Sequence, residues 1–134
     1  MESRPLPKIT KYNEPFFKVE RDELKLQRCT GCGNLIYFPR VACNQCLNAE
    51  LKWEKVSPLG TIYSYSKVYR PQHEYFFKDV PLVLIAVKLD EGPLVISNLI
   101  NYQPEDIKIG TRVKARREPV EKTDIKLLYF EPTK

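Results

Sequence analysis

The sequence predicts a mainly β protein in which a short N-terminal helix precedes a small module closed by a metal ion and a C-terminal five-stranded barrel. Three observations predict this class: a helix-start pattern near residue 14, four cysteines within residues 29–46, and short alternating strands after residue 53. The chain has 134 residues, enough for one core plus a metal-stapled module but not for two full cores. We therefore expect three parts, residues 1–23, 24–53 and 54–134.

The first part is predicted to contain a helix over residues 14–23. Asn13 can cap its first turn, and Pro15 fits a position where no backbone hydrogen bond is needed. Phe17 lies on the apolar face, which we expect to pack against the rest of the chain. Residues 24–28 alternate apolar and polar side chains, so they predict a strand that leads into the first cysteine.

Four cysteines are the strongest pattern in the sequence. They form two CxxC pairs, Cys29 with Cys32 and Cys43 with Cys46, separated by ten residues. Each CxxC turn directs two thiolates at one ion, so two turns complete a tetrahedral site. Residues 33–42 suit a hairpin between the pairs, and the segment predicts a rubredoxin-like zinc ribbon with one structural zinc ion. Iron held by the same four thiolates and disulfide chemistry are the alternatives that the spacing leaves open.

The third part changes to short strands separated by turn residues. Strands are predicted over residues 60–69, 82–89, 94–99, 111–117 and 125–130, with a turn at 90–93 and one helical turn at 104–108. Five strands with a helical turn between the third and the fourth are the element order of an OB-fold barrel, and an SH3-like barrel is the competing assignment. We expect the first strand to alternate its two faces and the second to be apolar on both.

Composition limits the possible functions. The chain has 22 Lys and Arg against 17 Asp and Glu, a net charge of +5, and the excess is spread over all three parts. Four thiolates and one zinc ion lower this charge to about +3. No apolar run is long enough to span a membrane, and no secretory signal is visible, so we expect a cytoplasmic protein. The thiols are committed to metal and His73 is the single histidine, so we expect no enzymatic activity.

The order of these parts resembles a known family, the acyl-CoA-associated zinc-ribbon/OB-fold proteins formerly catalogued as a domain of unknown function. The resemblance covers nearly the whole chain. Asn44 departs from it, because the family often has proline at that place, but the metal ligands are unaffected. The matching segments, besides the cysteine pairs, are Leu24–Cys29, Phe38–Arg40, Leu59–Ser64, Pro81–Val87 and Ile109–Val113.

The resemblance implies a non-catalytic accessory protein of thiolase-like acyl-CoA enzymes. Archaeal members are similar to the small subunit that joins acetoacetyl-CoA thiolase to hydroxymethylglutaryl-CoA synthase in the mevalonate pathway. That subunit lets the intermediate pass within a shared CoA-binding space. The expected partners are therefore a thiolase-like enzyme, hydroxymethylglutaryl-CoA synthase, and CoA or acyl-CoA.

Two groups of residues are candidates for contacts with such partners. A CoA site needs a few cations beside an apolar groove, and the fourth barrel strand has cations on one face with a further arginine after them. The long connection before the second barrel strand carries three consecutive aromatic residues, which either fold over an end of the barrel or present an apolar patch to a partner protein or an acyl chain. The candidate phosphate contacts are Arg112, Lys114, Arg116 and Arg117, and the candidate partner or acyl contacts are Tyr75, Phe76 and Phe77. A solvated strand face is the alternative explanation for the cations.

A nucleic-acid-binding module is the alternative function. OB-folds bind single strands through stacked aromatic side chains and basic grooves. Tyr63, Tyr65 and Tyr69 on the first barrel strand are the candidates for stacking. The even spread of charge and the acidic residues throughout the barrel argue against it, because a nucleic-acid footprint clusters Lys and Arg.

Overall fold

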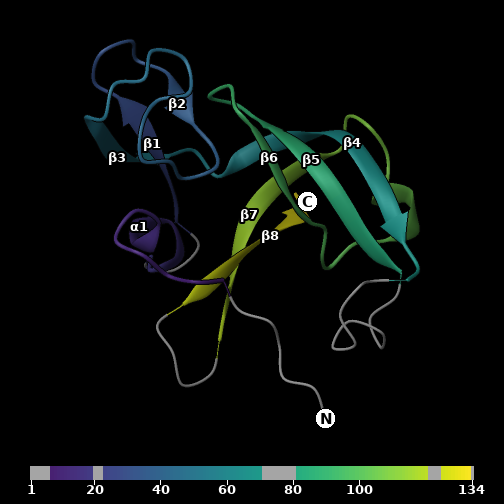
Figure 1. Cartoon of the computed structure of the whole chain (residues 1–134). Helices are drawn as coiled ribbons and strands as arrows, with labels where there is room; N and C mark the ends of the chain where they lie inside the picture. The colour runs from purple at the N-terminus through teal and green to yellow at the C-terminus, as the bar shows by residue number, and fades with distance from the viewer. Residues whose placement is uncertain (1–6, 20–22, 71–80, 121–124, 134) are drawn as a thin grey trace.

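A computed structural model describes residues 7–19, 23–70, 81–120 and 125–133. It contains a short helix, α1, a three-stranded sheet in the order β2-β1-β3, and a five-stranded sheet in the order β6-β5-β4-β7-β8. Figure 1 shows the small sheet beside one end of the large one, with α1 below the small sheet. The predicted class, a helix followed by a metal-binding module and a five-stranded barrel, is confirmed.

Helix α1 (Glu14–Phe17) is much shorter than the predicted helix over residues 14–23. The prediction was wrong because Lys18 leaves the helical region, with φ −103° and ψ 78°; residues 20–22 lie outside the described part. Asn13 is at the N-cap, but its side-chain oxygen accepts a hydrogen bond from the backbone N–H of Thr10 at 2.8 Å instead of capping the helix. The single turn survives because Phe16 and Phe17 are both buried in the main core.

The three-stranded sheet is organised around β1 (Leu24–Cys29), which confirms the strand predicted over residues 24–28. It pairs antiparallel with β2 (Leu35–Ile36) on one side and with β3 (Leu51–Val56) on the other. The sequence analysis did not anticipate β3, whose alternation is interrupted by charged residues. Because β1 ends at the first cysteine, this pairing fixes the direction in which the metal-binding turns leave the sheet.

The barrel contains the five predicted strands with a 3-10 turn, η2, between the third and the fourth. A parallel bridge from Leu99 to Phe130 brings the two outermost strands together, and the backbone N–H of Ile100 donates to the Phe130 carbonyl at 2.8 Å. This near-closure agrees with the OB-fold order. The elements are β4 (Leu59–Val68), β5 (Leu82–Leu89), β6 (Leu94–Asn98), η2 (Pro104–Asp106), β7 (Arg112–Pro119) and β8 (Lys126–Pro132).

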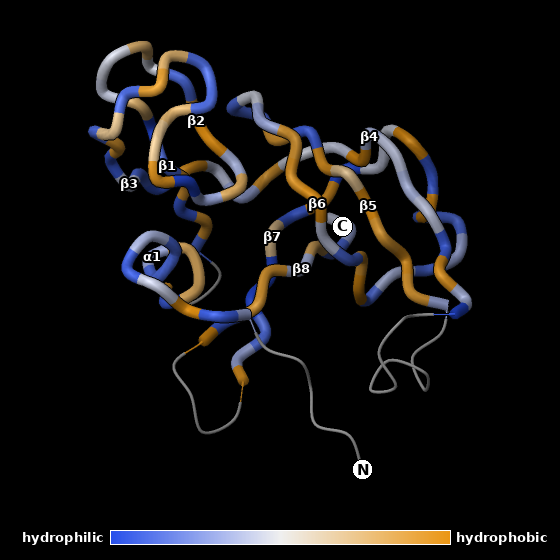
Figure 2. The backbone as a smooth tube through the Cα atoms, in the orientation of Figure 1, coloured by the Kyte–Doolittle hydropathy of each residue, from blue (hydrophilic) through white to orange (hydrophobic). Residues whose placement is uncertain are grey.

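Burial along the barrel strands corrects two details of the sequence prediction. Strand β5 has a neighbour on each side, but only one face is buried, since Leu84 is exposed while Val83 and Ile85 are not. Strand β4 alternates only as far as Ile62, because a bulge at Tyr63 shifts its register against β5, and the side chains beyond it are exposed on both faces. Figure 2 shows hydrophobic residues continuing along β5 and β6.

The two sheets share one main core. Buried side chains from α1, β1, β3 and the barrel belong to a single cluster, whereas a small separate cluster of Cys29, Ile36 and Cys43 lies at the metal-binding turns. The Tyr37 hydroxyl also donates to the Ile96 carbonyl at 3.1 Å, which joins the cysteine module to β6. Within the described residues, no helix is long and apolar enough to cross a membrane.

Candidate metal centre

The four cysteine sulfur atoms converge on one point. The Sγ atoms of Cys29 and Cys46 are 3.4 Å apart, those of Cys32 and Cys43 are 3.6 Å apart, and all four lie within 4.8 Å of one another. A zinc ion with four thiolates at 2.3 Å requires sulfur atoms about 3.8 Å apart. All four thiols are free, so the arrangement fits a metal site and not a pair of disulfides. The residues therefore match the predicted structural zinc ion.

The two CxxC turns repeat the same backbone hydrogen bonds. The N–H of Gly33 donates to the Cys29 carbonyl at 3.0 Å, and the N–H of Leu47 donates to the Cys43 carbonyl at 3.0 Å. The N–H of the first cysteine in each pair also donates to a carbonyl five residues later: Cys29 to Asn34 and Cys43 to Asn48, both at 2.9 Å. The sequence does not show this equivalence, because the second turn has no glycine at the place of Gly33.

Backbone N–H groups stabilise the ionised form of two of the sulfur atoms, which is the form that binds a metal ion. The backbone N–H of Cys46, and then that of Gln45, lower the pKa of the Cys43 thiol to about 6. The amide of Cys32 lowers the pKa of Cys29 in the same way. At Cys32 the amide of Asn34 also lowers the pKa, but burial and the neighbouring sulfurs outweigh it and raise the pKa to about 12. Four thiolates so close together need a divalent cation to hold them all ionised.

The loop between the two cysteine pairs is fixed to β1 by one buried side chain. The Gln27 amide donates to the Arg40 carbonyl at 2.9 Å, and its oxygen accepts from the Arg40 N–H at 2.7 Å. Gln27 is only 4% exposed, so these bonds satisfy both ends of an amide that water cannot reach. Sequence reasoning missed this residue, since a glutamine at a polar position of an alternating strand is ordinarily exposed.

Leu47 stores local strain in the second turn, and replacing it should stabilise the protein. Its φ is 64°, close to the 76° of Gly33 at the equivalent place, and its side chain is 80% exposed. Only glycine adopts this region without a steric cost. We expect Leu47→Gly to raise stability by about 1 kcal/mol, or roughly 3 °C in Tm, in thermal unfolding of the zinc-bound protein. Gly33→Ala is the matched control and should lower Tm; a fall in Tm for Leu47→Gly would contradict this explanation.

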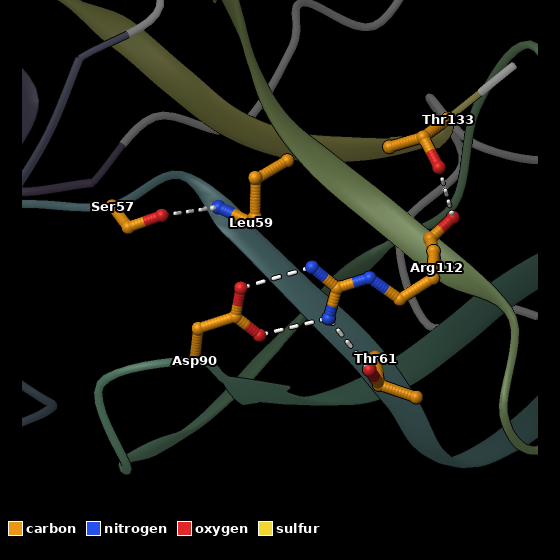
Figure 3. A network of polar contacts seen from close by, with 6 residues as sticks. All are labelled: Ser57, Leu59, Thr61, Asp90, Arg112 and Thr133. Atoms are coloured by element: carbon orange, nitrogen blue, oxygen red, sulfur yellow. Dashed lines mark hydrogen bonds and ion pairs between the residues drawn. The ribbon is translucent and has the colours of Figure 1, made fainter.

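The structure separates the four candidate cations on β7. Arg112, Lys114 and Arg116 share the exposed face of the strand, as the alternation predicts, whereas Arg117 lies on the opposite, buried face. Arg112 makes two hydrogen bonds to the Asp90 carboxylate, at 2.8 and 2.9 Å, and a third to Thr61 (Figure 3). These bonds lower the pKa of Asp90. Arg116 is 3.2 Å from Glu131, so within the described residues Lys114 is the cation on this face for which no ion pair is found.

Arg117 connects the barrel to the N-terminal part of the chain. It is 4% exposed, its Nε donates to the Glu23 carbonyl at 3.0 Å, and its Nη1 donates to the Lys126 carbonyl at 3.1 Å. Its guanidinium also stacks 5.1 Å from the ring of Phe16. The structure therefore does not bring Arg117 together with the other three cations. Tyr75, Phe76 and Phe77, the candidate partner contacts, lie outside the described residues.

A groove that the sequence analysis missed lies between the cysteine module and the barrel. It has a volume of about 340 Å³, and aromatic side chains of α1 and of the loop after β2 form one wall. The rings of Phe16 and Phe38 meet edge to face at 6.2 Å. Phe38 and Ile96 remain 54% and 58% exposed. The consecutive aromatic residues at 16–17 and 37–38 could have indicated the wall, but not that β6 and β8 form the other side.

The fold and the site define a two-module protein, a structural zinc ribbon joined to an OB-fold barrel. The model of the ChsH2 rubredoxin-like zinc ribbon domain matches residues 18–52, and that of the ChsH2 C-terminal OB-fold domain matches residues 53–118. A "DUF35 domain-containing scaffold protein" of Methanothermobacter thermautotrophicus is 36% identical over 97 residues, which cover 71% of each chain. The chain belongs to this DUF35 family.

Two further proteins are similar to the chain. A "Probable enoyl-CoA hydratase alpha subunit" of Thermomonospora curvata is 34% identical over 113 residues, which are 82% of this chain. The chain spans about a third of the length of that relative, 34%. A chain of the solved structure "Ltp2-ChsH2(DUF35) aldolase" superposes with a TM-score of 0.78 at 28% identity, covering 95% of this chain and 98% of that one. The family expected from the sequence is thus confirmed.

Proposed function

We propose that the chain is a non-catalytic accessory subunit that holds acyl-CoA enzymes of the thiolase-like class together in the cytoplasm. The observation that carries the proposal is the fixed join between its two modules. Tyr37 hydrogen-bonds across to Ile96, and Arg117 ties the barrel to the start of β1. A protein that sets the distance between two enzymes needs such a rigid body. The scaffold-protein relatives and the aldolase-complex chain support this role.

The proposed scaffold also contributes to binding CoA or acyl-CoA. The groove beside Phe38 and Ile96 is mainly apolar and suits the neutral, flexible part of such a ligand. Lys114 and Arg116 are the cations of β7 best placed for phosphate groups, because both lie on the exposed face and the single contact of Arg116 with Glu131, at 3.2 Å, holds it less firmly than the two bonds from Asp90 hold Arg112. Arg112 is neutralised by Asp90 and Arg117 is buried, so we assign these two arginines structural roles.

The proposed partners are a thiolase-like enzyme and hydroxymethylglutaryl-CoA synthase, whose active sites the chain would bridge. Tyr75, Phe76 and Phe77 remain the proposed contacts with a partner enzyme or an acyl group. Three adjacent aromatic residues are the kind of anchor that the centres of protein interfaces favour.

Copurification with the zinc-bound chain tests this function. We expect the tagged chain to retain acetoacetyl-CoA thiolase and hydroxymethylglutaryl-CoA synthase activities from extracts of the source organism. Phe38→Asp with Ile96→Asp should weaken CoA binding, measured by calorimetry on the complex, by roughly tenfold. Leu94→Asp is the matched control, since Leu94 is exposed but does not line the groove. Retention of neither activity, together with no heat of CoA binding, would overturn the proposal.

Nucleic-acid binding stays the second candidate because of one observation. Tyr63, Tyr65 and Tyr69 are 60%, 43% and 63% exposed on and just after β4, which leaves their rings available for stacking. A salt-sensitive complex with a generic single-stranded oligonucleotide, lost in Tyr65→Ala, would favour this function over the scaffold.

A further inference from the structure

The outer half of β4 extends beyond the part of the barrel that β7 covers. Strand β4 pairs with β5 from Gly60 to Val68, but with β7 only from Leu59 to Thr61. Side chains from Tyr63 to Lys67 are exposed on both faces. Figure 1 shows β4 bending and then running beside β5 toward the end of the barrel farthest from the small sheet.

One backbone edge of this segment has no strand beside it among the described residues. The last hydrogen bonds on the β7 side are made by Ile62, whose N–H donates to the Thr111 carbonyl and whose carbonyl accepts from Gly110, both at 2.9 Å. Beyond Ile62, the ladders that the structure describes run only to β5. Such an edge presents regularly spaced N–H and C=O groups, which bind another extended strand.

Natural edge strands usually carry prolines or charged side chains that prevent pairing with another strand, and the outer half of β4 carries few of them. The sequence from residue 63 to residue 68 is Tyr-Ser-Tyr-Ser-Lys-Val, with no proline and one charged residue. By contrast, the outer strand β3 of the small sheet carries Lys52, Glu54 and Lys55. The aromatic and hydroxyl side chains of β4 also favour an extended conformation.

We propose that this edge pairs with the same edge of a second copy of the chain, antiparallel about a twofold axis at Tyr65. A twofold axis perpendicular to the sheet keeps the two faces matched, so each residue must oppose one of the same face. Centred on Tyr65, the register sets Ser64 opposite Ser66 of the second copy and Tyr65 opposite itself; both serines lie on the face of Leu84 and Ala86. Hydroxyl pairs and aromatic pairs are favourable across antiparallel strands.

Charge favours a second copy as the occupant. The segment from Tyr63 to Val68 carries one charged residue, Lys67, and the proposed register keeps the two Lys67 side chains from facing each other. The free segment is short, so the interface is smaller than the roughly 1,200 Å² of a stable complex, and the dimer should be weak and concentration-dependent. Figure 1 shows the small sheet and α1 at the other end of the molecule, so the metal site stays accessible in the dimer.

Reciprocal charge variants at Ser64 and Ser66 test the proposal on the isolated zinc-bound chain. Sedimentation of the wild type should show dimers forming as the concentration rises toward roughly 1 mM. S64K/S66K and S64E/S66E each place like charges directly opposite and should raise the dimer Kd at least tenfold. An equimolar mixture of the two variants should dimerise again, because every Lys then faces a Glu.

Restoration in the mixture is the decisive result, since it requires both the edge and the register. Bound zinc and unchanged circular dichroism of each variant show that folding is preserved, as expected for exposed side chains. A monomeric wild type, charge variants that dimerise like the wild type, or a mixture that stays monomeric would each overturn the proposal. The inference does not rest on the proposed scaffold function, because no enzyme or CoA is present in the measurement.

Discussion

Cys43→Ser is expected to release the zinc ion and unfold the small module while the barrel remains folded. Cys43 is buried in the small cluster that contains Cys29 and Ile36, and the hydrogen bond between the Asn34 and Asn44 side chains that also joins the two turns is exposed. In zinc-finger peptides, zinc binding supplies roughly 10–16 kcal/mol of folding free energy. Three remaining thiolates cannot provide the four-sulfur coordination of a closed structural site.

Metal analysis and hydrogen exchange should measure this effect. The wild type should contain one zinc ion per chain, and Cys43→Ser should contain none. Backbone amides over residues 29–52 should then exchange rapidly, while those of β4 to β8 stay protected. Gln45→Ala is the matched control in the same turn, because its backbone N–H still donates to the Cys43 sulfur. Retention of zinc by Cys43→Ser, or iron with visible absorbance in the wild type, would contradict the assignment.

Acid should release the metal in the wild type as well, since protons compete with zinc for the thiolates. Amide donors lower the pKa of Cys43 to about 6. The thiolate of Cys43 therefore persists to lower pH than an ordinary thiol would allow, which delays the loss of zinc as the pH falls. The stability that this thiolate contributes is present above the ordinary thiol pKa and is lost as the pH falls through the lowered value.

Arg117→Met is expected to have the second-largest effect. It should lower the free energy of unfolding by about 3 kcal/mol, or Tm by roughly 10 °C. Methionine fills a similar volume, but it leaves the carbonyls of Glu23 and Lys126 without their charged donor and removes the cation from the face of Phe16. Loss of the buried charge returns some desolvation energy, which keeps the expected cost below the sum of the separate contacts.

Arg116→Met is the matched control for Arg117→Met, one residue away on the exposed face. Its ion pair with Glu131 is exposed, and such pairs contribute at most about 1 kcal/mol. The two variants also separate stability from ligand binding. We expect Arg116→Met to weaken CoA binding with little change in Tm, and Arg117→Met to lower Tm without a direct effect on CoA affinity. Equal effects of the two variants on Tm would contradict the structural role of Arg117.

Local sequence patterns predicted the elements that depend on local chemistry. The CxxC spacing predicted the metal site because one short turn determines how two thiolates are aimed, whatever surrounds it. The turn before β6 and the 3-10 turn before β7 were equally predictable from Gly92 and Pro104. The predicted length of α1 was wrong, because a pattern of apolar residues does not show where packing ends a helix and begins a strand.

Contacts between distant segments could not be predicted in the same way. The alternation of the sequence placed Arg112, Lys114 and Arg116 on one face of β7. It could not show that Arg112 forms an ion pair with Asp90. The sequence suggested Arg117 as a fourth member of the cationic group. Its side chain is instead buried and donates a hydrogen bond to the carbonyl of Glu23, 94 residues away in the chain. The groove likewise joins side chains of α1, the loop after β2, β6 and β8, which are far apart in the sequence.

The sequence by itself determined the class of the protein, the four cysteines of the expected metal site and its family, because these depend on residue types at short, fixed spacings. Only the tertiary structure decided which cations stay exposed, that aromatic residues of the small module and strands of the barrel form one groove, and that the outer half of β4 extends beyond β7. The physical reason is register. Shifting a strand by one residue reverses which side chains are buried, and the pairing that sets register is made by segments far apart in the chain.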